Sequence, residues 1–252
     1  MKISFVIPAW NEEKYIAQSL ESIIERAKYT SHEVEIIAVN NASVDKTRDI
    51  ILQYSEVILV DEPKKGLPQA RQAGFLASTG DIIANMDADS ILPPKWIGRA
   101  VYEFSKDEKL VALSGPYRFY DMPGIINFSA NIFYFPGYLI HLFNHHILGK
   151  GAMLQGGNFV LRRSALESIG GFDVNIKFYG EDTDIARRIS KAGKVKFSHN
   201  FIMTTSGRRL KKEGLFTTLG RYVINHLWIL LFKKPLTKNY AYVGDEKAEN
   251  RK

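Results

Sequence analysis

The 252-residue sequence contains no cysteine, which excludes disulfides and thiolate metal sites and fits a reducing compartment. It also lacks two glycine-rich phosphate-binding patterns: no G-x-G-x-x-G follows the first strand-like run, and no G-x-x-x-x-G-K-[ST] occurs. A dinucleotide-binding fold and a P-loop enzyme are therefore disfavoured. The opening KISFVIP carries one lysine and no small-residue cleavage pattern, so we expect no signal peptide.

Positive charge is concentrated near the end of the chain. Residues 1–205 hold 23 Lys and Arg against 23 Asp and Glu, whereas residues 206–252 hold 11 against 4 and supply the whole net charge of +7. A basic stretch of this kind favours an anionic surface such as a membrane, a phosphate group or nucleic acid. Because apolar residues interrupt it and the rest of the chain is neutral, we predict a membrane surface and no nucleic acid.

Strand and helix signals alternate along the first half of the chain. Short apolar runs predict strands at 3–7, 34–39, 57–60, 81–86 and 110–114, with helices at about 11–24, before Tyr54, at 66–77 and at 95–105. The second half adds predicted strands at 156–160 and 194–205 and a helix at about 181–191. This order predicts right-handed βαβ units and an α/β fold whose mostly parallel sheet has helices on both faces.

Polar residues follow the predicted strands at Trp10-Asn11-Glu12, Asn40-Asn41, Asp61-Glu62 and Asp87-Ala88-Asp89. We expect them to converge at the carboxyl edge of the sheet, where open α/β sheets bind ligands. Asn11 is also the expected N-cap of the first helix.

Asp87 and Asp89 form a D-x-D pair at the end of a predicted buried strand. On an extended backbone, residues two apart point to the same side, so both carboxylates would project together. Two close negative charges need a positive partner, and a hard divalent cation carrying phosphate oxygens would suit them. A solvated turn before Pro93-Pro94 is the alternative for an isolated D-x-D.

A second polar block begins at Gly156-Gly157-Asn158, where a flexible glycine pair enters a strand. Glu181, Asp182 and Asp184 then open a predicted helix. Acidic residues at a helix start can serve as capping residues alone, and we expect this of Asp184.

Two apolar stretches stand out. Residues 122–149 contain no Asp, Glu, Lys or Arg and are broken by Pro136-Gly137, which predicts interface-lying helices or, equally, helices packed over the sheet or into a dimer. Residues 215–232 combine an apolar face with a narrow polar stripe and are followed by Lys233-Lys234, a pattern typical of a membrane-interface helix.

Four stretches resemble the family-two glycosyltransferases, which have the GT-A fold: SFVIPAWNEE, IIAVNNASVDKT, GLPQARQAGFLASTGDIIANMDADS and GGNFVLRRSALESIGGFDVNIKFYGEDTDIARRISKAG. The match covers roughly residues 3–115 and 155–205. It implies metal-dependent, inverting transfer of a sugar, hexosyltransferase-like, from a UDP- or GDP-linked donor to an acceptor hydroxyl.

The resemblance also assigns residues to roles. Glu181 and Asp182 would be catalytic residues, with Asp182 as the general base, and Asp89 with Asp87 would hold Mg²⁺ or Mn²⁺. The nucleotide sugar would contact Pro8, Trp10, Glu12, Asn40, Arg71, Asp87 and Ala88. Asn40-Asn41 stand where the family usually has two aspartates, which leaves uridine and guanosine both open.

Phosphate or acceptor groups would contact Gly157, Asn158, Arg118, Arg208 and Arg209. Arg118 resembles an arginine of the dolichol-phosphate mannose synthase branch, within a polyprenyl-phosphate sugar synthase-like group. Arg208 and Arg209 could clamp a phosphate or belong to the basic tail. The family often has a metal-binding histidine where this chain has MTTSGRR, and we expect the earlier His199 to be structural.

We therefore expect a glycosyltransferase catalytic domain over residues 1–210, with an apolar insertion at 122–149, and a basic amphipathic membrane-associating tail over 211–252. The expected location is cytoplasmic and peripheral on the membrane face, with a lipid-linked or saccharide acceptor. The alternative is a non-catalytic nucleotide-sugar-binding, membrane-associated partner protein that keeps the fold.

Overall fold

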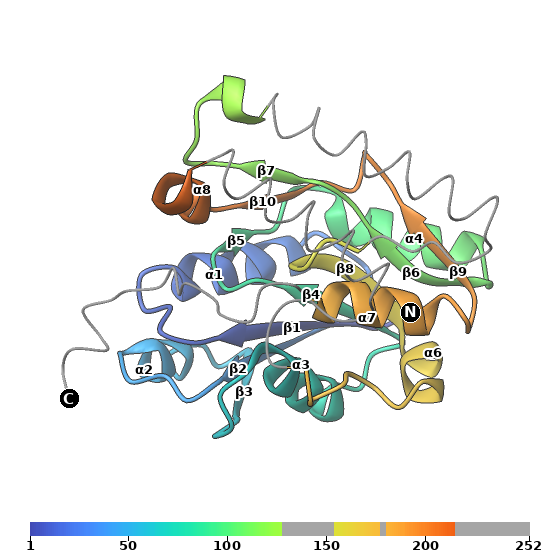
Figure 1. Cartoon of the computed structure of the whole chain (residues 1–252), viewed down its shortest axis with the longest axis horizontal. Helices are drawn as coiled ribbons and strands as arrows, with labels where there is room; N and C mark the ends of the chain where they lie inside the picture. The colour runs from blue at the N-terminus through green and yellow to red at the C-terminus, as the bar shows by residue number, and fades with distance from the viewer. Residues whose placement is uncertain (128–153, 177–179, 215–252) are drawn as a thin grey trace.

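The computed structural model describes residues 1–127, 154–176 and 180–214 (Figure 1). The predictions for residues 128–149 and for 215–252 lie outside these ranges. The predicted domain boundary after residue 210 falls inside helix α8 (Arg208–Glu213).

Most of the described residues belong to strands and helices. The strands are β1 (Ile3–Ala9), β2 (Val34–Asn40), β3 (Val57–Asp61), β4 (Ile82–Met86), β5 (Ser90–Ile91), β6 (Leu110–Ser114), β7 (Tyr117–Phe119), β8 (Asn158–Arg162), β9 (Lys194–Phe197) and β10 (Met203–Thr205). Besides α8, the helices are α1 (Ile16–Ala27), α2 (Thr47–Ile51), α3 (Leu67–Ala77), α4 (Trp96–Lys106), α6 (Arg163–Ser168) and α7 (Glu181–Ile189).

The central sheet of the described residues has seven strands in the order β3-β2-β1-β4-β8-β6-β9 (Figure 1). Strand β8 runs antiparallel to both of its neighbours, and the other strands run parallel to one another. The predicted α/β class with a mostly parallel sheet is confirmed.

Helices cover both faces of this sheet. Side chains along each strand point alternately into two apolar cores, one on each face. Ile3, Phe5 and Ile7 of β1 pack with apolar residues of α1, α2 and α4. Val6 of β1 packs on the other face, with apolar residues of α3, α6 and α7. Side chains alternate along a strand, so a sheet buried on both faces reads as a continuous apolar run, as ISFVI does.

A small second sheet, β5-β10-β7, follows the carboxyl end of β4. Strand β10 pairs antiparallel with β5 and parallel with β7. Through this pairing, residues near 90, 117 and 205 come together, and α8 follows directly after them in the chain.

Two local predictions are wrong. The strand expected at 194–205 is two strands in different sheets, because a turn in which Phe201 N donates to Ser198 O (2.9 Å) separates them. Asn11 does not cap the first helix, which begins at Ile16. Asn11 instead has a φ of 55°, a conformation that asparagine tolerates, and its Oδ1 accepts a hydrogen bond from Val44 N.

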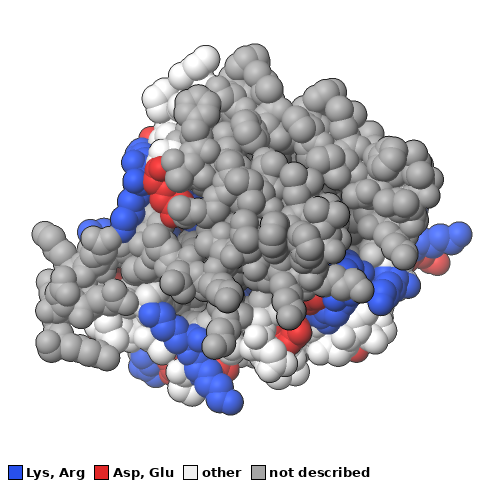
Figure 2. All heavy atoms as spheres, in the orientation of Figure 1, with Lys and Arg blue, Asp and Glu red and all other residues white. Residues whose placement is uncertain are grey.

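Across the described ranges, no helix combines the length and the apolar character needed to cross a bilayer. In the space-filling view, basic and acidic side chains of described residues stand close together along the edges of the face shown (Figure 2). This mixture agrees with the balanced charge of residues 1–205.

Candidate active site

The predicted site residues meet at the carboxyl edge of the parallel strands. Because β8 runs antiparallel, its first residue, Asn158, pairs with the last residue of β4, Met86. The Gly156-Gly157 pair therefore lies beside Asp87. Helix α7 contributes Glu181 and Asp182 from its first turn.

The D-x-D segment is a turn and not a continuation of the strand. Strand β4 ends at Met86, and Ser90 N donates to Asp87 O at 3.0 Å. The two carboxylates consequently have different partners and different exposures, 39% for Asp87 and 11% for Asp89. The expectation that both would project from an extended backbone is wrong.

Asp87 is held by Tyr117 of β7. The Tyr117 hydroxyl donates to Asp87 Oδ2 at 3.1 Å and accepts from Gly157 N at 2.5 Å. A Cβ at position 157 would overlap the Asp87 carboxylate and lie 2.6 Å from the Tyr117 hydroxyl, so this approach requires glycine. Sequence reasoning missed Tyr117, although the tyrosine directly precedes Arg118.

Arg71 of α3 joins the D-x-D turn to the start of α7. Its side chain is 1% exposed, and its Nη1 donates to Glu181 Oε1 at 2.8 Å. Its Nη2 donates to the Gly156 carbonyl and lies 3.8 Å from Asp87 Oδ1. Arg71, which was expected to contact the donor, is therefore buried and lies beside two carboxylates, and its contact with a donor stays a prediction.

Glu181 and Asp182 stand at a helix start, where the dipole favours negative charge. A Cβ at Gly156 would lie 3.9 Å from both Glu181 Oε1 and Asp182 Oδ2, so both acids border the glycine pair. Burial raises the pKa of Glu181 to about 7; Asp182 adds to this shift and Arg71 opposes it. Asp87 and Asp182 are thus brought to the same two glycines.

The expectation that Asp184 caps α7 is wrong: the N-cap is Gly180 with no side-chain cap, and Asp184 forms ion pairs within the helix. Its carboxylate pairs with Arg187 at 2.8 Å and with Arg188 at 2.6 Å. Arg188 also donates to the Ile169 and Gly171 carbonyls, which fixes α7 to the preceding turn.

Arg208 of α8 lies between Glu12 and Asp89. Its Nη1 and Nη2 donate to the two Glu12 oxygens at 2.8 and 2.5 Å, and its Nε lies 2.8 Å from Asp89 Oδ2. The guanidinium also lies 4.8 Å from the Tyr15 ring centroid. Arg208, which was expected to clamp a phosphate or to belong to the basic tail, thus joins an expected nucleotide ligand to an expected metal ligand.

We call Glu12, Asp87, Asp89, Glu181 and Asp182 the carboxylate cluster. Burial raises the pKa of Glu12 to about 7 and raises the pKa of Asp89, and Arg208 opposes both shifts. Among the described residues, the Arg71 guanidinium lies beside Glu181 and Asp87, and the Arg208 guanidinium lies beside Glu12 and Asp89.

At the ends of β2 and β3, Asn40 is 7% exposed and its Nδ2 donates to Asp61 Oδ1 at 2.8 Å. Asp61 also receives a forked contact from Arg48. Lys65 Nζ lies 3.1 Å from the Trp10 ring centroid, a cation–π contact. From the sequence, Asp61 was identified only as a strand-end residue and Lys65 was missed. The Asn40–Asp61 and Lys65–Trp10 contacts each join residues that are distant in the sequence, so local patterns do not predict them.

Two expected ligands have other surroundings. Asn158 is fully buried: its Nδ2 donates to the Gly115 and Phe201 carbonyls and its Oδ1 accepts from Trp96 Nε1 at 3.2 Å. Its side chain holds β8 in place and is not accessible to an acceptor. Ala88 is 3% exposed and its side chain packs in the core.

The other residues that were expected to bind ligands differ in their exposure to solvent. Pro8 and Trp10 are partly exposed at the end of β1, Arg118 is exposed on β7, and Arg209 is partly exposed on α8. Neighbouring residues on a strand point to opposite faces, so Arg118 faces away from the Asp87 contact that Tyr117 makes. The phosphate contacts expected of Arg118 and Arg209 stay predictions.

No cluster of three or more His, Asp or Glu side chains suited to a metal occurs in the part of the chain that the structure describes. His199 packs edge-on against Phe197, at 5.6 Å between ring centroids. Among these residues, cation ligands at the D-x-D turn would come from Asp87 and Asp89.

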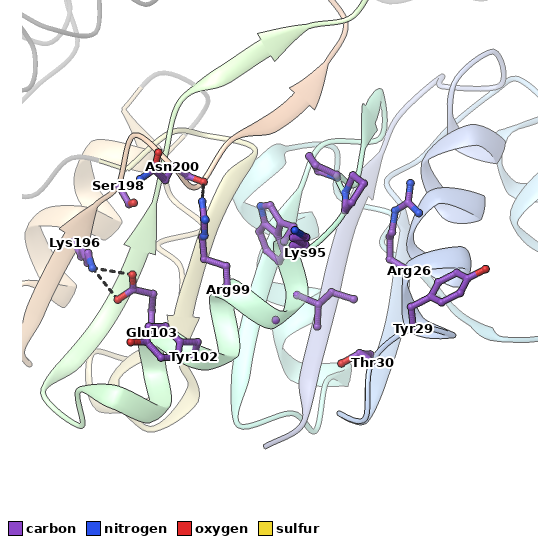
Figure 3. Close-up of a pocket in the computed structure, with 15 residues that line it drawn as sticks. Arg26, Tyr29, Thr30, Lys95, Arg99, Tyr102, Glu103, Lys196, Ser198 and Asn200 are labelled. Atoms are coloured by element: carbon purple, nitrogen blue, oxygen red, sulfur yellow. Dashed lines mark hydrogen bonds and ion pairs between the residues drawn. The ribbon is translucent and has the colours of Figure 1, made fainter.

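A separate groove of about 930 Å³ lies along α4 (Figure 3). Arg99 reaches across it to the Asn200 carbonyl, and Lys196 pairs with Glu103 at 2.7 Å. Its lining residues do not include any member of the carboxylate cluster. The groove is therefore not part of the candidate active site.

Comparison with known proteins gives relatives of one kind. The model of the family described as Glycosyl transferase family 2 matches residues 4–170. The chain is 32% identical over 213 residues to the probable glycosyltransferase YdaM of Bacillus subtilis (strain 168), covering 76% of this chain and 47% of that protein. It is 37% identical over 97 residues to the dolichyl-phosphate beta-glucosyltransferase ALG5D of Trichomonas vaginalis, covering 34% of this chain and 30% of that protein.

Among solved structures, the mannosyltransferase PcManGT of Pyrobaculum calidifontis, in complex with GDP-Man and Mn²⁺, superposes with a TM-score of 0.65. The two share 20% identity over 88% of this chain and 64% of that one, which shows a common fold. The chain spans about half the length of YdaM and about a third of ALG5D. The family model matches residues 4–170, which is more than half of the chain: the chain belongs to glycosyltransferase family 2.

Proposed function

We propose that the chain transfers a sugar from a nucleotide-diphosphate donor to an acceptor hydroxyl, with inversion at the anomeric carbon. The observation that carries this proposal is the Arg71 bridge between Glu181 and Asp87. Through it, a D-x-D turn and a helix start rich in acids border the same glycine pair. A donor-binding group and a general base would need this proximity.

The nucleotide would bind at the ends of β1, β2 and β3. Partly exposed Pro8 and Trp10 offer apolar contact, and Asn40 with Asp61 offers polar groups at the strand edge. PcManGT is described with GDP-Man, which supports a nucleotide sugar of this class. The base of the donor would be uridine or guanosine.

The D-x-D turn fits a hard divalent cation, because the carboxylate oxygens of Asp87 and Asp89 are donors that suit Mg²⁺ or Mn²⁺. Asp89 and Asp87 would hold the ion together with donor phosphate oxygens. Bound there, a divalent cation supplies charge neutralisation for the departing nucleoside diphosphate. The Mn²⁺ in the PcManGT complex supports this assignment.

Asp182 would act as the general base. Its carboxylate takes the proton of the acceptor hydroxyl while that oxygen bonds to the anomeric carbon and the bond from this carbon to the diphosphate oxygen breaks. Arg71 holds the neighbouring Glu181 in place. A single base opposite the leaving group gives one displacement and therefore inversion.

We further propose a lipid-linked or membrane-proximal acceptor and a peripheral location on the cytoplasmic face of a membrane. The excess of positive charge in residues 206–252 and the dolichyl-phosphate in the name of ALG5D support this. The full chain should float with vesicles of phosphatidylglycerol and not with phosphatidylcholine alone. Failure to bind either would contradict the membrane assignment and leave sugar transfer unaffected.

The main test is transfer and hydrolysis of radiolabelled UDP- and GDP-sugars by the full chain. Asp89→Ala and Asp182→Asn should each lower turnover by about 10²-fold or more, since each removes a group needed in the transition state. Unchanged turnover in both variants would overturn the assignment. Metal-dependent donor binding without turnover on any acceptor would favour a non-catalytic binder.

A further inference from the structure

Asp89, the proposed metal ligand, already has a cation beside it. Arg208 Nε lies 2.8 Å from Asp89 Oδ2, while Thr205 Oγ1 donates to Oδ1 at 3.3 Å. The Asp89 side chain is 11% exposed, so a positive charge at this carboxylate must sit among buried groups. In the described residues, Arg208 occupies that position.

The guanidinium of Arg208 is not held equally by its two carboxylates. Two hydrogen bonds in a forked arrangement attach it to Glu12, and one contact attaches it to Asp89. Forked arginine–carboxylate pairs are stronger and more directional than single contacts. The contact with Asp89 is therefore the one that can open while Arg208 keeps a partner.

We propose that Arg208 is an internal competitor for the divalent cation: it neutralises Asp89 when the site is empty and leaves Asp89, while staying on Glu12, when the metal and donor bind. The proposal rests on the metal site of the proposed function and adds a residue that sets its affinity. A guanidinium and a metal ion cannot both use the same lone pairs of Asp89 Oδ2. Any free energy that the Asp89–Arg208 pair contributes is therefore lost from metal binding.

The position of this competitor is fixed from outside the cluster. Asp121 accepts hydrogen bonds from Ser206 Oγ (3.0 Å), Gly207 N (2.6 Å) and Lys211 Nζ (3.0 Å). These bonds hold the first turn of α8, from which Arg208 extends. Asp121 is therefore a positioning residue for Arg208 and does not itself touch the carboxylate cluster.

The test is the affinity for Mn²⁺ alone, without donor, measured by electron paramagnetic resonance on the full chain. Arg208→Gln should bind Mn²⁺ about tenfold more tightly than the wild type, within the usual range of coupling between two sites. Lys212→Gln is the matched control, since it removes one positive charge from the same helix and should leave the affinity unchanged. Equal or weaker binding by Arg208→Gln would overturn the proposal.

Two further variants keep the test decisive. If Arg208→Gln does not fold, Asp121→Asn, which loosens α8 without touching the cluster, should also tighten Mn²⁺ binding, and an unchanged affinity would count against the proposal. Asp89→Ala separates the two levels of inference. If Asp89→Ala loses Mn²⁺ binding and Arg208→Gln does not change it, the competition by Arg208 is overturned and the metal site stands. If Asp89→Ala binds Mn²⁺ as tightly as the wild type, the metal site is overturned as well.

Discussion

Arg71 and Glu181 are 110 residues apart in the chain, yet the arginine Nη1 donates to Glu181 Oε1 at 2.8 Å in a buried pair. The same guanidinium lies 3.8 Å from Asp87. One side chain of α3 therefore sets the positions of acids from two other segments. This relationship connects the stability of the fold to the geometry of the candidate active site.

Arg71→Met should destabilise the protein by about 3 kcal/mol at pH 8, because it leaves Glu181 buried without its positive partner. Urea unfolding measures this loss. The control is Arg48→Met, which breaks the half-exposed Arg48–Asp61 pair and should cost less than about 1 kcal/mol. Equal losses in the two variants would contradict the importance of the buried bridge.

Arg71→Lys keeps the charge but lacks the fork that reaches Glu181, Asp87 and the Gly156 carbonyl. We expect a fall in kcat of about 10²-fold, the size associated with misplacement of a reacting group by about 1 Å. Donor turnover at saturating concentration measures this. Wild-type kcat would show that the bridge does not position the reacting groups.

Gly157→Ala should lower turnover by about 10²-fold, since the new methyl group would overlap Asp87 and crowd Tyr117. Gly98→Ala in α4 is the matched control, because a Cβ there meets no atom within 4 Å. That substitution should keep full activity and gain at most about 1 kcal/mol of stability from helix propensity. Similar activity in the two variants would argue against a close Gly157–Asp87 approach.

Asp182→Asn and Asp184→Asn separate the two acids of α7. The first should lower kcat by about 10²- to 10⁴-fold, because the amide cannot accept the acceptor proton. The second removes only ion pairs with Arg187 and Arg188, so it should lower stability modestly and retain activity. A reversed order of effects on kcat would transfer the role of base to Asp184.

The raised pKa of Glu181, about 7 against an ordinary value of 4.5, predicts a pH dependence of stability. The folded state binds this proton more tightly than the unfolded state. The contribution of Glu181 to stability is therefore fully present below about pH 4.5, where both states are protonated, and is lost as the pH rises through about 7. Arg71 and Asp182 face this group from α3 and α7.

Thermal unfolding between about pH 5 and pH 8, with chelator present, measures this effect. The wild type should lose stability across the window, and Glu181→Gln should lose less because the amide does not ionise. Glu12 also has a pKa of about 7, so Glu181→Gln should still lose some stability between about pH 5 and pH 8 through the ionisation of Glu12. Identical slopes in the two proteins would show that Glu181 does not titrate in this range.

The parallel strands and the D-x-D could be predicted because their signals are local. Apolar runs mark β1, β2 and β4 by composition alone, and the turn residues follow them directly. The predicted sheet edge is also where the structure places Asp87 and the Gly156-Gly157 pair.

Other parts of the site depend on pairing that periodicity does not encode. Arg208 meets Glu12 across 196 residues, through a small sheet whose two- and three-residue strands carry almost no pattern. The choice between Tyr117 and Arg118 depends on the register of β7 with β10, which pairs Tyr117 with Met203. Asn158 was predicted to be a ligand because it is a polar residue after two glycines. The sequence gives no sign that its amide donates to buried backbone carbonyls.

The most direct measurement is a crystal structure of the chain with Mn²⁺ and a nucleotide sugar, with the metal located by anomalous scattering. The account predicts a manganese peak at the Asp89 carboxylate and the sugar ring between that ion and Asp182. The Asp182 carboxylate should lie within hydrogen-bond reach of the position from which an acceptor hydroxyl attacks the anomeric carbon. A manganese peak away from Asp87 and Asp89, or a sugar ring remote from Asp182, would contradict the account.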